Sequence, residues 1–127
     1  MSDCLDSWAV LRWLEGVEPA ASVVDAALQT RPVMSWINLG EVQYVVERRA
    51  GRDRARNVVR GLQATLDLDL PSSQRVMDAS HIKAQHALAY ADAFAIATAI
   101  AHRATLLTGD PEILDGDPDW PTRDLRP

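Results

Sequence analysis

The sequence predicts an α/β fold in which a mostly parallel sheet is covered on both faces by helices. Two observations support this prediction: short strand-like segments alternate with helical segments, and acidic residues follow two of the predicted strands. In such folds, ligands bind outside the carboxyl ends of the strands. With 127 residues and no long linker, the chain is expected to form a single domain spanning residues 1–127.

The first part of the chain predicts a strand, two helices and a second strand. Residues 1–5 form a short first strand, with fewer apolar side chains than a central strand usually has. Apolar side chains at helical spacing predict helices over 8–15 and 19–29, and the second of these begins at a proline. Pro32 ends that helix, and the segment 33–36 predicts a short strand.

The middle part predicts two helices and an edge strand. One helix begins at residue 38 and extends to about residue 50, where Gly51 interrupts it. An arginine-rich helix then covers about 53–66. Residues 66–70 alternate apolar and acidic side chains, which is typical of an edge strand, and Pro71 ends this segment.

The last part predicts two helices and two strands. A helix covers about 74–89, with Met77 among its expected core contacts, and the alanine-rich segment 91–102 predicts a closely packed central helix. Residues 104–108 predict a buried strand, and 120–125 a weak final one.

Four acidic residues occupy positions where a strand ends or where an apolar side chain would be expected. Isolated carboxylates are costly in a low-dielectric interior, so buried acids are paired, protonated or bound to metal. Hard divalent cations such as Mg²⁺ and Mn²⁺ take carboxylate oxygens as ligands. The sequence therefore predicts one cation site, formed by Asp6, Glu41, Asp92 and Asp110.

Each of these acids also has a purely structural explanation. Asp6 and Asp110 stand where helix N-caps are expected, and a proline follows Asp110. Glu41 has the offset of a capping box from Asn38, and Asp92 lies in a first helical turn, where the helix dipole favours negative charge. The combination nevertheless favours a shared site, because helix starts at strand ends bring such caps together and two of the acids continue apolar stripes.

Composition and charge restrict the function classes. The formal charge of −5 argues against general nucleic-acid coating, yet six of the 13 basic residues lie between Arg48 and Arg60. These arginines form either a solvated helix face paired with Glu47 and Asp53, or a surface for RNA or a partner protein. A single cysteine, Cys4, together with the lack of a signal peptide or a membrane-spanning run, predicts a cytoplasmic protein.

Four segments in the same order resemble the PIN-domain ribonucleases, and more narrowly the VapC toxins of bacterial toxin–antitoxin pairs. These segments are Leu5–Leu11, Ser35–Val42, Ala91–Ala99 and Leu106–Asp110. The stretch 82–84 is also typical of that group. No single segment is specific, but four with the right order and spacing cover almost the whole chain.

The resemblance implies a three-layer α/β/α fold and a Mg²⁺- or Mn²⁺-dependent endoribonuclease that cleaves RNA. It places Asp6, Glu41, Asp92 and Asp110 in the acidic cluster of the family, Thr108 as its hydroxyl residue and Asn38 as its polar residue. Glu112 matches a further acid, so the fourth corner of the site is Asp110, Glu112 or both. The implied partner is a VapB-like antitoxin whose C-terminal segment covers the acidic crevice.

Several features leave alternatives open. Lys83 is either a solvent-facing side chain or a phosphate contact, and 115–119 reads as a polar turn rather than a calcium loop. Trp8, Trp13 and Trp36 are consistent with a homodimer but also with a place in the core. The rival functions are a catalytically silent binding module with the same fold and a metal-dependent nuclease that acts on DNA.

Overall fold

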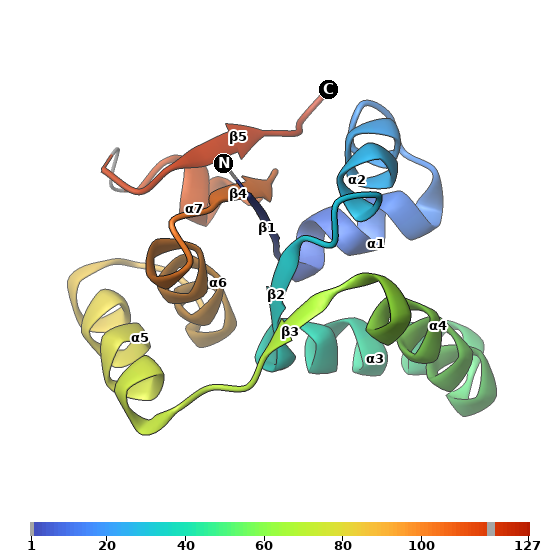
Figure 1. The fold of residues 1–127 in the computed structure, drawn as a ribbon, viewed down its shortest axis with the longest axis horizontal. Helices are drawn as coiled ribbons and strands as arrows, with labels where there is room; N and C mark the ends of the chain where they lie inside the picture. Colours follow the sequence, from blue (N-terminus) through green and yellow to red (C-terminus); the bar gives the residue numbers. More distant parts are fainter. Residues whose placement is uncertain (1, 117–118) are drawn as a thin grey trace.

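The computed structural model describes residues 2–116 and 119–127, and it places a parallel sheet between two layers of helices (Figure 1). The strands are β1 (Asp3–Leu5), β2 (Val33–Ser35), β3 (Asp67–Asp69), β4 (Thr105–Thr108) and β5 (Thr122–Asp124). The helices are α1 (Ser7–Glu15), α2 (Ala20–Leu28), α3 (Trp36–Ala50), α4 (Arg52–Thr65), α5 (Ser73–Gln85), α6 (Tyr90–Ala101) and α7 (Pro111–Leu114). The predicted α/β/α architecture is confirmed.

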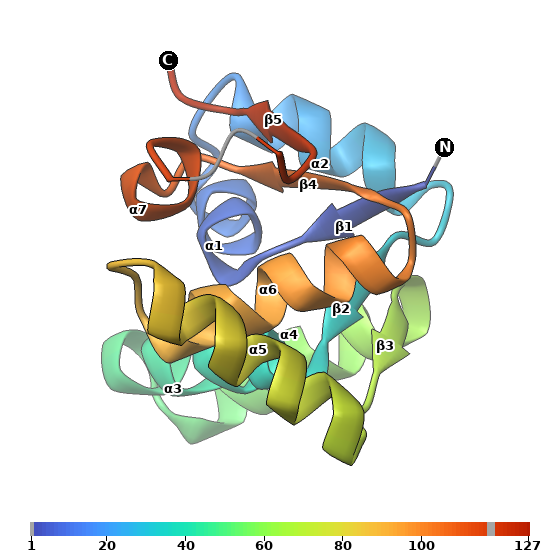
Figure 2. The same cartoon turned by 90° about the vertical axis from the view of Figure 1, so that its left-hand side faces the viewer.

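The order of the strands places a reversal of winding at the centre of the sheet. The order is β3-β2-β1-β4-β5, and every pairing is parallel. The chain moves outward from β1 to β3, then returns past β1 to add β4 and β5 on its other side (Figure 2). β1 and β4 pair directly, with Leu5 opposite Leu107. The carboxyl ends of these two strands therefore mark the place where folds of this type bind ligands.

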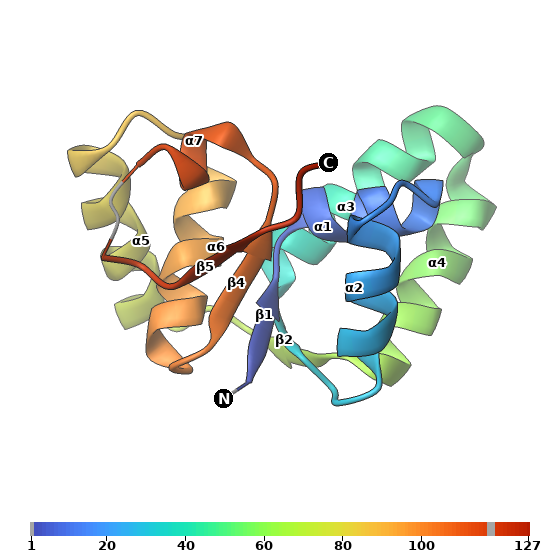
Figure 3. The ribbon, with the colours of Figure 1, turned by 90° about the horizontal axis from the view of Figure 1, so that it is seen from above.

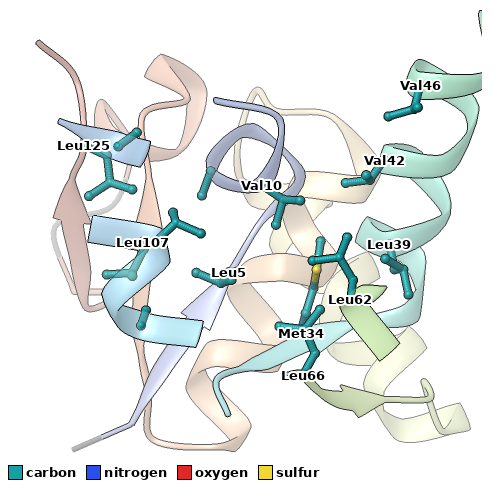
Figure 4. Close-up of a cluster of buried hydrophobic side chains, with 14 of the residues drawn as sticks. Leu5, Val10, Met34, Leu39, Val42, Val46, Leu62, Leu66, Leu107 and Leu125 are labelled. Atoms are coloured by element: carbon teal, nitrogen blue, oxygen red, sulfur yellow. The ribbon is translucent and has the colours of Figure 1, made fainter. Parts of the chain in front are cut away.

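The strands send alternate side chains into two separate cores, because successive residues of a strand point to opposite faces. Leu5 and Leu107 belong to a core that also contains side chains of α1 to α4 (Figure 4). Cys4 and Leu106 belong to a second core, formed with α5, α6 and α7. Figure 3 shows the two helical layers on either side of the sheet. This packing fixes the start of each helix relative to the strand that precedes it.

Some boundaries differ from the sequence prediction. β2 ends at Ser35 and α3 begins at Trp36 rather than at Asn38, because the Ser35 hydroxyl accepts a hydrogen bond from the N–H of Ile37 at 3.2 Å and caps the helix. α5 ends at Gln85, earlier than predicted, where the backbone becomes extended. α7 is a short additional helix that the predicted elements did not include.

The structure confirms some of the remaining predictions and contradicts others. β1 is central although it has only three residues, and β3 forms the edge predicted for residues 66–70. Met77 is 60% exposed and so is not a core contact, and the buried residue of α5 is Ala79. Of the predicted polar turn, Asp117 and Pro118 lie outside the described residues. Within the described part of the chain, no helix has the length and apolar character needed to cross a membrane.

Candidate metal centre

The four predicted acids lie at the starts of helices that follow, or pack beside, the central strands. Asp6 directly follows β1 and caps α1, and Asp110 lies two residues beyond β4 and caps α7. Asp92 lies in the first turn of α6, and Glu41 in the second turn of α3. Their charges act on one another: Asp110 and Glu41 raise the pKa of Asp6, and all three raise the pKa of Asp92. The fold therefore brings the predicted residues together.

Asp6 is the innermost acid, with 1% of its surface exposed. One of its oxygens, Oδ1, accepts a hydrogen bond from the N–H of Ala9 at 2.8 Å, which is the capping bond of α1. Its other oxygen, Oδ2, accepts a hydrogen bond from the hydroxyl of Thr108. The same hydroxyl accepts a bond from the N–H of Asp110 at 3.0 Å. Helix capping and a place in the acidic cluster are thus compatible for Asp6, and Thr108 ties the ends of β1 and β4 together.

Glu41 does not form the predicted capping box, because Asn38 is already the third residue of α3. Its Oε1 instead accepts a hydrogen bond from the hydroxyl of Ser7 at 2.5 Å. Ser7 is a buried site residue that sequence reasoning missed. Its position next to Asp6 was the available signal, but the contact depends on the packing of α1 against α3, which has no local signature.

Asn38 connects α3 to the start of α6. Its amide nitrogen donates a hydrogen bond to the carbonyl of Ala91 at 3.0 Å, directly before Asp92. Its Oδ1 is buried and is the one buried side-chain oxygen or nitrogen without a hydrogen-bond partner among the described residues. Buried acceptors are normally satisfied, so this oxygen is available to a donor that arrives with a ligand.

The fourth corner of the cluster contains both Asp110 and Glu112. With Asp92, these residues offer three carboxylate oxygens that lie within 4.8 Å of one another. The N–H of Glu112 donates to Asp110 at 2.9 Å, and Glu112 Oε2 accepts from the N–H of Ala89 at 3.1 Å. Glu112 also shares a hydrogen bond with Asp92, which raises the pKa of Asp92. Glu112 therefore belongs geometrically to the acidic cluster.

The cluster lacks compensating positive charge. Burial, followed by the charges of neighbouring carboxylates, raises the pKa of Asp6 to about 7 and that of Asp92 to about 8. Among the described residues, none of the five carboxylates forms an ion pair with an arginine, lysine or histidine. Oxygen donors in such an arrangement fit Mg²⁺ or Mn²⁺, which prefer carboxylates, and the unpartnered Asn38 oxygen provides a further polar group beside them.

Lys83 contacts the backbone of the segment that precedes α6. Its Nζ donates a hydrogen bond to the carbonyl of Leu88 at 2.7 Å. This bond holds the segment before α6, whose next residue, Ala89, binds Glu112. Lys83 is therefore exposed, as one of the two predicted alternatives holds, but its ammonium group is tied to the backbone.

The fold and the site together define an α/β/α protein with a carboxylate cluster at the reversal point of a parallel sheet. The sequence profile of the PIN domain family matches residues 4–117. The chain belongs to the PIN domain family.

Solved structures show the same fold at low sequence identity. The chain resembles VapBC2 from Rickettsia felis bound to a promoter DNA fragment (TM-score 0.78, 16% identity, covering 99% of this chain and 100% of that one). It also resembles DNA-bound VapBC from Salmonella typhimurium (TM-score 0.77, 18% identity, covering 98% of this chain and 98% of that one). A third similar structure is VapC20 from Mycobacterium tuberculosis, described as a sarcin–ricin loop cleaving toxin (TM-score 0.76, 13% identity, covering 99% of this chain and 100% of that one). No curated protein matches the sequence significantly.

Proposed function

We propose that this protein is a VapC-type toxin, a metal-dependent endoribonuclease that acts in the cytoplasm and is inhibited by a VapB-like antitoxin. The observation that carries the proposal is the group of carboxylates without counter-charge at the reversal point of a PIN-domain sheet. The proposed ligands of Mg²⁺ or Mn²⁺ are Asp6, Glu41, Asp92 and Asp110, with Glu112 as an additional one. Similar structures that are toxins or toxin–antitoxin complexes support this assignment.

The residues of the chain have distinct roles in this proposal. When bound, the cation supplies a Lewis acid that stabilises negative charge on the phosphoryl oxygens and lowers the pKa of a water ligand. Thr108 and Ser7 orient the carboxylates of Asp6 and Glu41 through hydrogen bonds. The buried Oδ1 of Asn38 accepts a hydrogen bond from a donor of the substrate or of an ordered water. In this arrangement no histidine is needed as a base.

The cleavage of RNA tests the proposal directly. The purified protein is expected to cleave a structured RNA with Mg²⁺ or Mn²⁺, and Asp92→Asn is expected to abolish cleavage while circular dichroism stays native. Cleavage of DNA but not of RNA would instead favour the DNA nuclease. If Asp92→Asn still cleaves RNA or DNA like the wild type, then the acidic cluster is not the catalytic site. Antitoxin binding without any cleavage would favour the silent binding module.

The antitoxin is proposed to anchor in an apolar groove between α1, α2 and α4. This cavity has a volume of about 570 Å³, and its apolar lining includes Trp13, Leu14, Leu28, Val58 and Leu62. Such a groove fits the apolar face of a helix from a partner protein. Gly61 lines it too; this residue is exposed, and a Cβ added at this position would meet no atom within 4 Å.

A substitution at Gly61 therefore tests this docking site without disturbing the fold. Gly61→Trp is expected to fill the groove, weaken antitoxin binding in calorimetry and leave RNA cleavage unchanged. Gly40→Ala, on α3 and equally free of neighbouring atoms, is the control for the loss of a helical glycine. Unchanged antitoxin affinity in Gly61→Trp would place the partner elsewhere.

We also propose a homodimer, but through a surface other than the three tryptophans that first suggested it. Trp8, Trp13 and Trp36 are half-buried against the core of their own chain, so most of their surface is already covered, and Trp13 lines the groove proposed for the antitoxin. Among the large exposed apolar side chains, Met77 on α5 and Ile100 on α6 are more exposed than those on α3. Light scattering is expected to give a dimer for the wild type and a monomer for Met77→Glu.

A further inference from the structure

One face of α3 carries a row of side chains that begins at the acidic cluster. At about 100° per residue, positions 37, 41, 44 and 48 lie within a sector of about 60°. This sector faces away from the buried side of the helix, which contains Leu39, Val42 and Val46. Glu41 therefore has one turn of exposed helix before it and two turns after it on the same face.

The side chains in this row are unusually large for an exposed face. Ile37 is 40% exposed and Tyr44 is 47% exposed. The guanidinium carbon of Arg48 lies 5.0 Å from the centre of the Tyr44 ring, which is a cation–π contact. Tyr44 and Arg48 therefore form a prearranged aromatic and cationic pair, and Tyr44 lies one helical turn beyond a carboxylate of the site.

The arginines around this row favour the binding of a polyanion. Arg48 belongs to a group of six exposed arginines at the end of α3 and on α4: Arg48, Arg49, Arg52, Arg54, Arg56 and Arg60. Among the described residues, Arg49 alone of these forms an ion pair, with Glu15. One predicted alternative was a solvated helix face with partial pairing to Glu47 and Asp53; the six arginines are solvated, but no such pair occurs among the described residues. Five cations therefore have no acidic partner in this part of a chain of net charge −5.

We propose that α3 guides the RNA strand away from the acidic centre, with one base stacked on the Tyr44–Arg48 pair and the backbone held by Arg48. Single-stranded RNA is recognised by stacking on aromatic rings and guanidinium planes, combined with phosphate contacts to cations. The rise from Glu41 to Tyr44 is about 4.5 Å along the helix and that from Tyr44 to Arg48 about 6 Å, so adjacent nucleotides reach successive residues. This inference rests on the proposed ribonuclease function and assigns Tyr44 and Arg48 as positioning residues for its substrate.

The test measures RNA binding separately from cleavage. The probe is a fluorescein-labelled single-stranded RNA of about 12 nucleotides, bound in Mg²⁺ by Asp92→Asn protein so that it is not cut. Tyr44→Ala in that background is expected to raise the Kd about 5- to 100-fold, and Tyr44→Phe to change it less than about 2-fold, because phenylalanine keeps the stacking surface. Arg48→Gln is expected to reduce the slope of log Kd against log salt by about 0.7 for each lost phosphate contact.

Two controls make the outcome decisive. Arg103→Gln removes an exposed arginine at the opposite end of α6 from Asp92, and it is expected to leave affinity and salt slope unchanged. Light scattering of Tyr44→Ala tests the rival occupant, because a change of oligomeric state would show that α3 contacts a second copy and overturn the proposal.

The RNA path along α3 and the ribonuclease function can be refuted separately. If wild-type protein cleaves RNA, but Tyr44→Ala and Arg48→Gln change neither the affinity of the Asp92→Asn protein nor the kcat/KM of the wild type, then the α3 path is wrong and the ribonuclease function stands. If wild-type protein neither binds nor cleaves RNA in Mg²⁺ or Mn²⁺, then the proposed function itself fails.

Discussion

Neutralising Asp92 is expected to stabilise the metal-free protein, and the gain should grow with pH. The pKa of Asp92 is about 8 in the fold against 3.8 when exposed, so between about pH 4 and pH 8 the folded protein holds a proton that the unfolded chain has released. The folded state binds more protons, and wild-type stability must therefore fall as pH rises through this window. Asp92→Asn removes the titrating group and keeps a donor toward Glu112.

The magnitude follows from the proton difference. One proton changes the free energy of unfolding by at most about 1.4 kcal/mol per pH unit, so the gain from Asp92→Asn should increase by about 2 kcal/mol between about pH 5 and pH 7. For a chain of this size that corresponds to roughly 6 °C in Tm. Mn²⁺ replaces the proton, so it should raise the Tm of the wild type most at about pH 8 and leave Asp92→Asn nearly unchanged.

Thermal unfolding followed by circular dichroism, with and without Mn²⁺, measures both effects. Asp78→Asn, which removes an exposed acid of α5, is the matched control and should run parallel to the wild type at every pH. Parallel curves for wild type and Asp92→Asn would refute the argument, because they would mean that Asp92 ionises normally in the folded protein.

Three further substitutions test the support of the site. Thr108→Val removes the hydroxyl shared by Asp6 and Asp110, and calorimetry with Mn²⁺ should show an affinity about 10- to 100-fold lower, whereas Thr108→Ser should keep it. Gly109→Ala should lower Tm substantially, because a Cβ there would lie 2.2 Å from the Trp8 ring; a wild-type Tm would mean that the ring moves freely. Ser35→Ala should cost about 1 kcal/mol in urea unfolding, since it removes the cap of α3; an unchanged free energy of unfolding would mean that the cap is not needed.

The parts of the site that depend on local sequence were predictable. Asp6 and Asp110 follow strands and precede helices, and both features are visible within a few residues of each acid. Asp92 stands out because it is the single charged residue of an apolar helix. Parallel strands bring such helix starts to one edge of the sheet, so the shared location also followed from the fold class.

The parts that depend on packing between distant elements were not predictable. The bond from Ser7 to Glu41 joins α1 to α3, and the bond from Asn38 to Ala91 joins α3 to α6. Glu41 was predicted from its place on an apolar helical stripe, and the capping box that offered a purely structural alternative is absent, because Ser35 caps α3 instead. Local sequence shows which residues can form a cap, but tertiary contacts decide which of the possible partners each one meets.

The strand order also determines when during synthesis the centre can form. The hydroxyl of Thr108 and the carboxylate of Asp6 that it binds are separated by 102 residues, and β4 lies directly beside β1. A ribosome-bound chain that ends before β4 has Asp6 and Glu41 but lacks Thr108, Asp110 and Glu112. Such a nascent chain cannot assemble the complete cluster, so the proposed ribonuclease activity would arise only after the last strands have emerged from the ribosome.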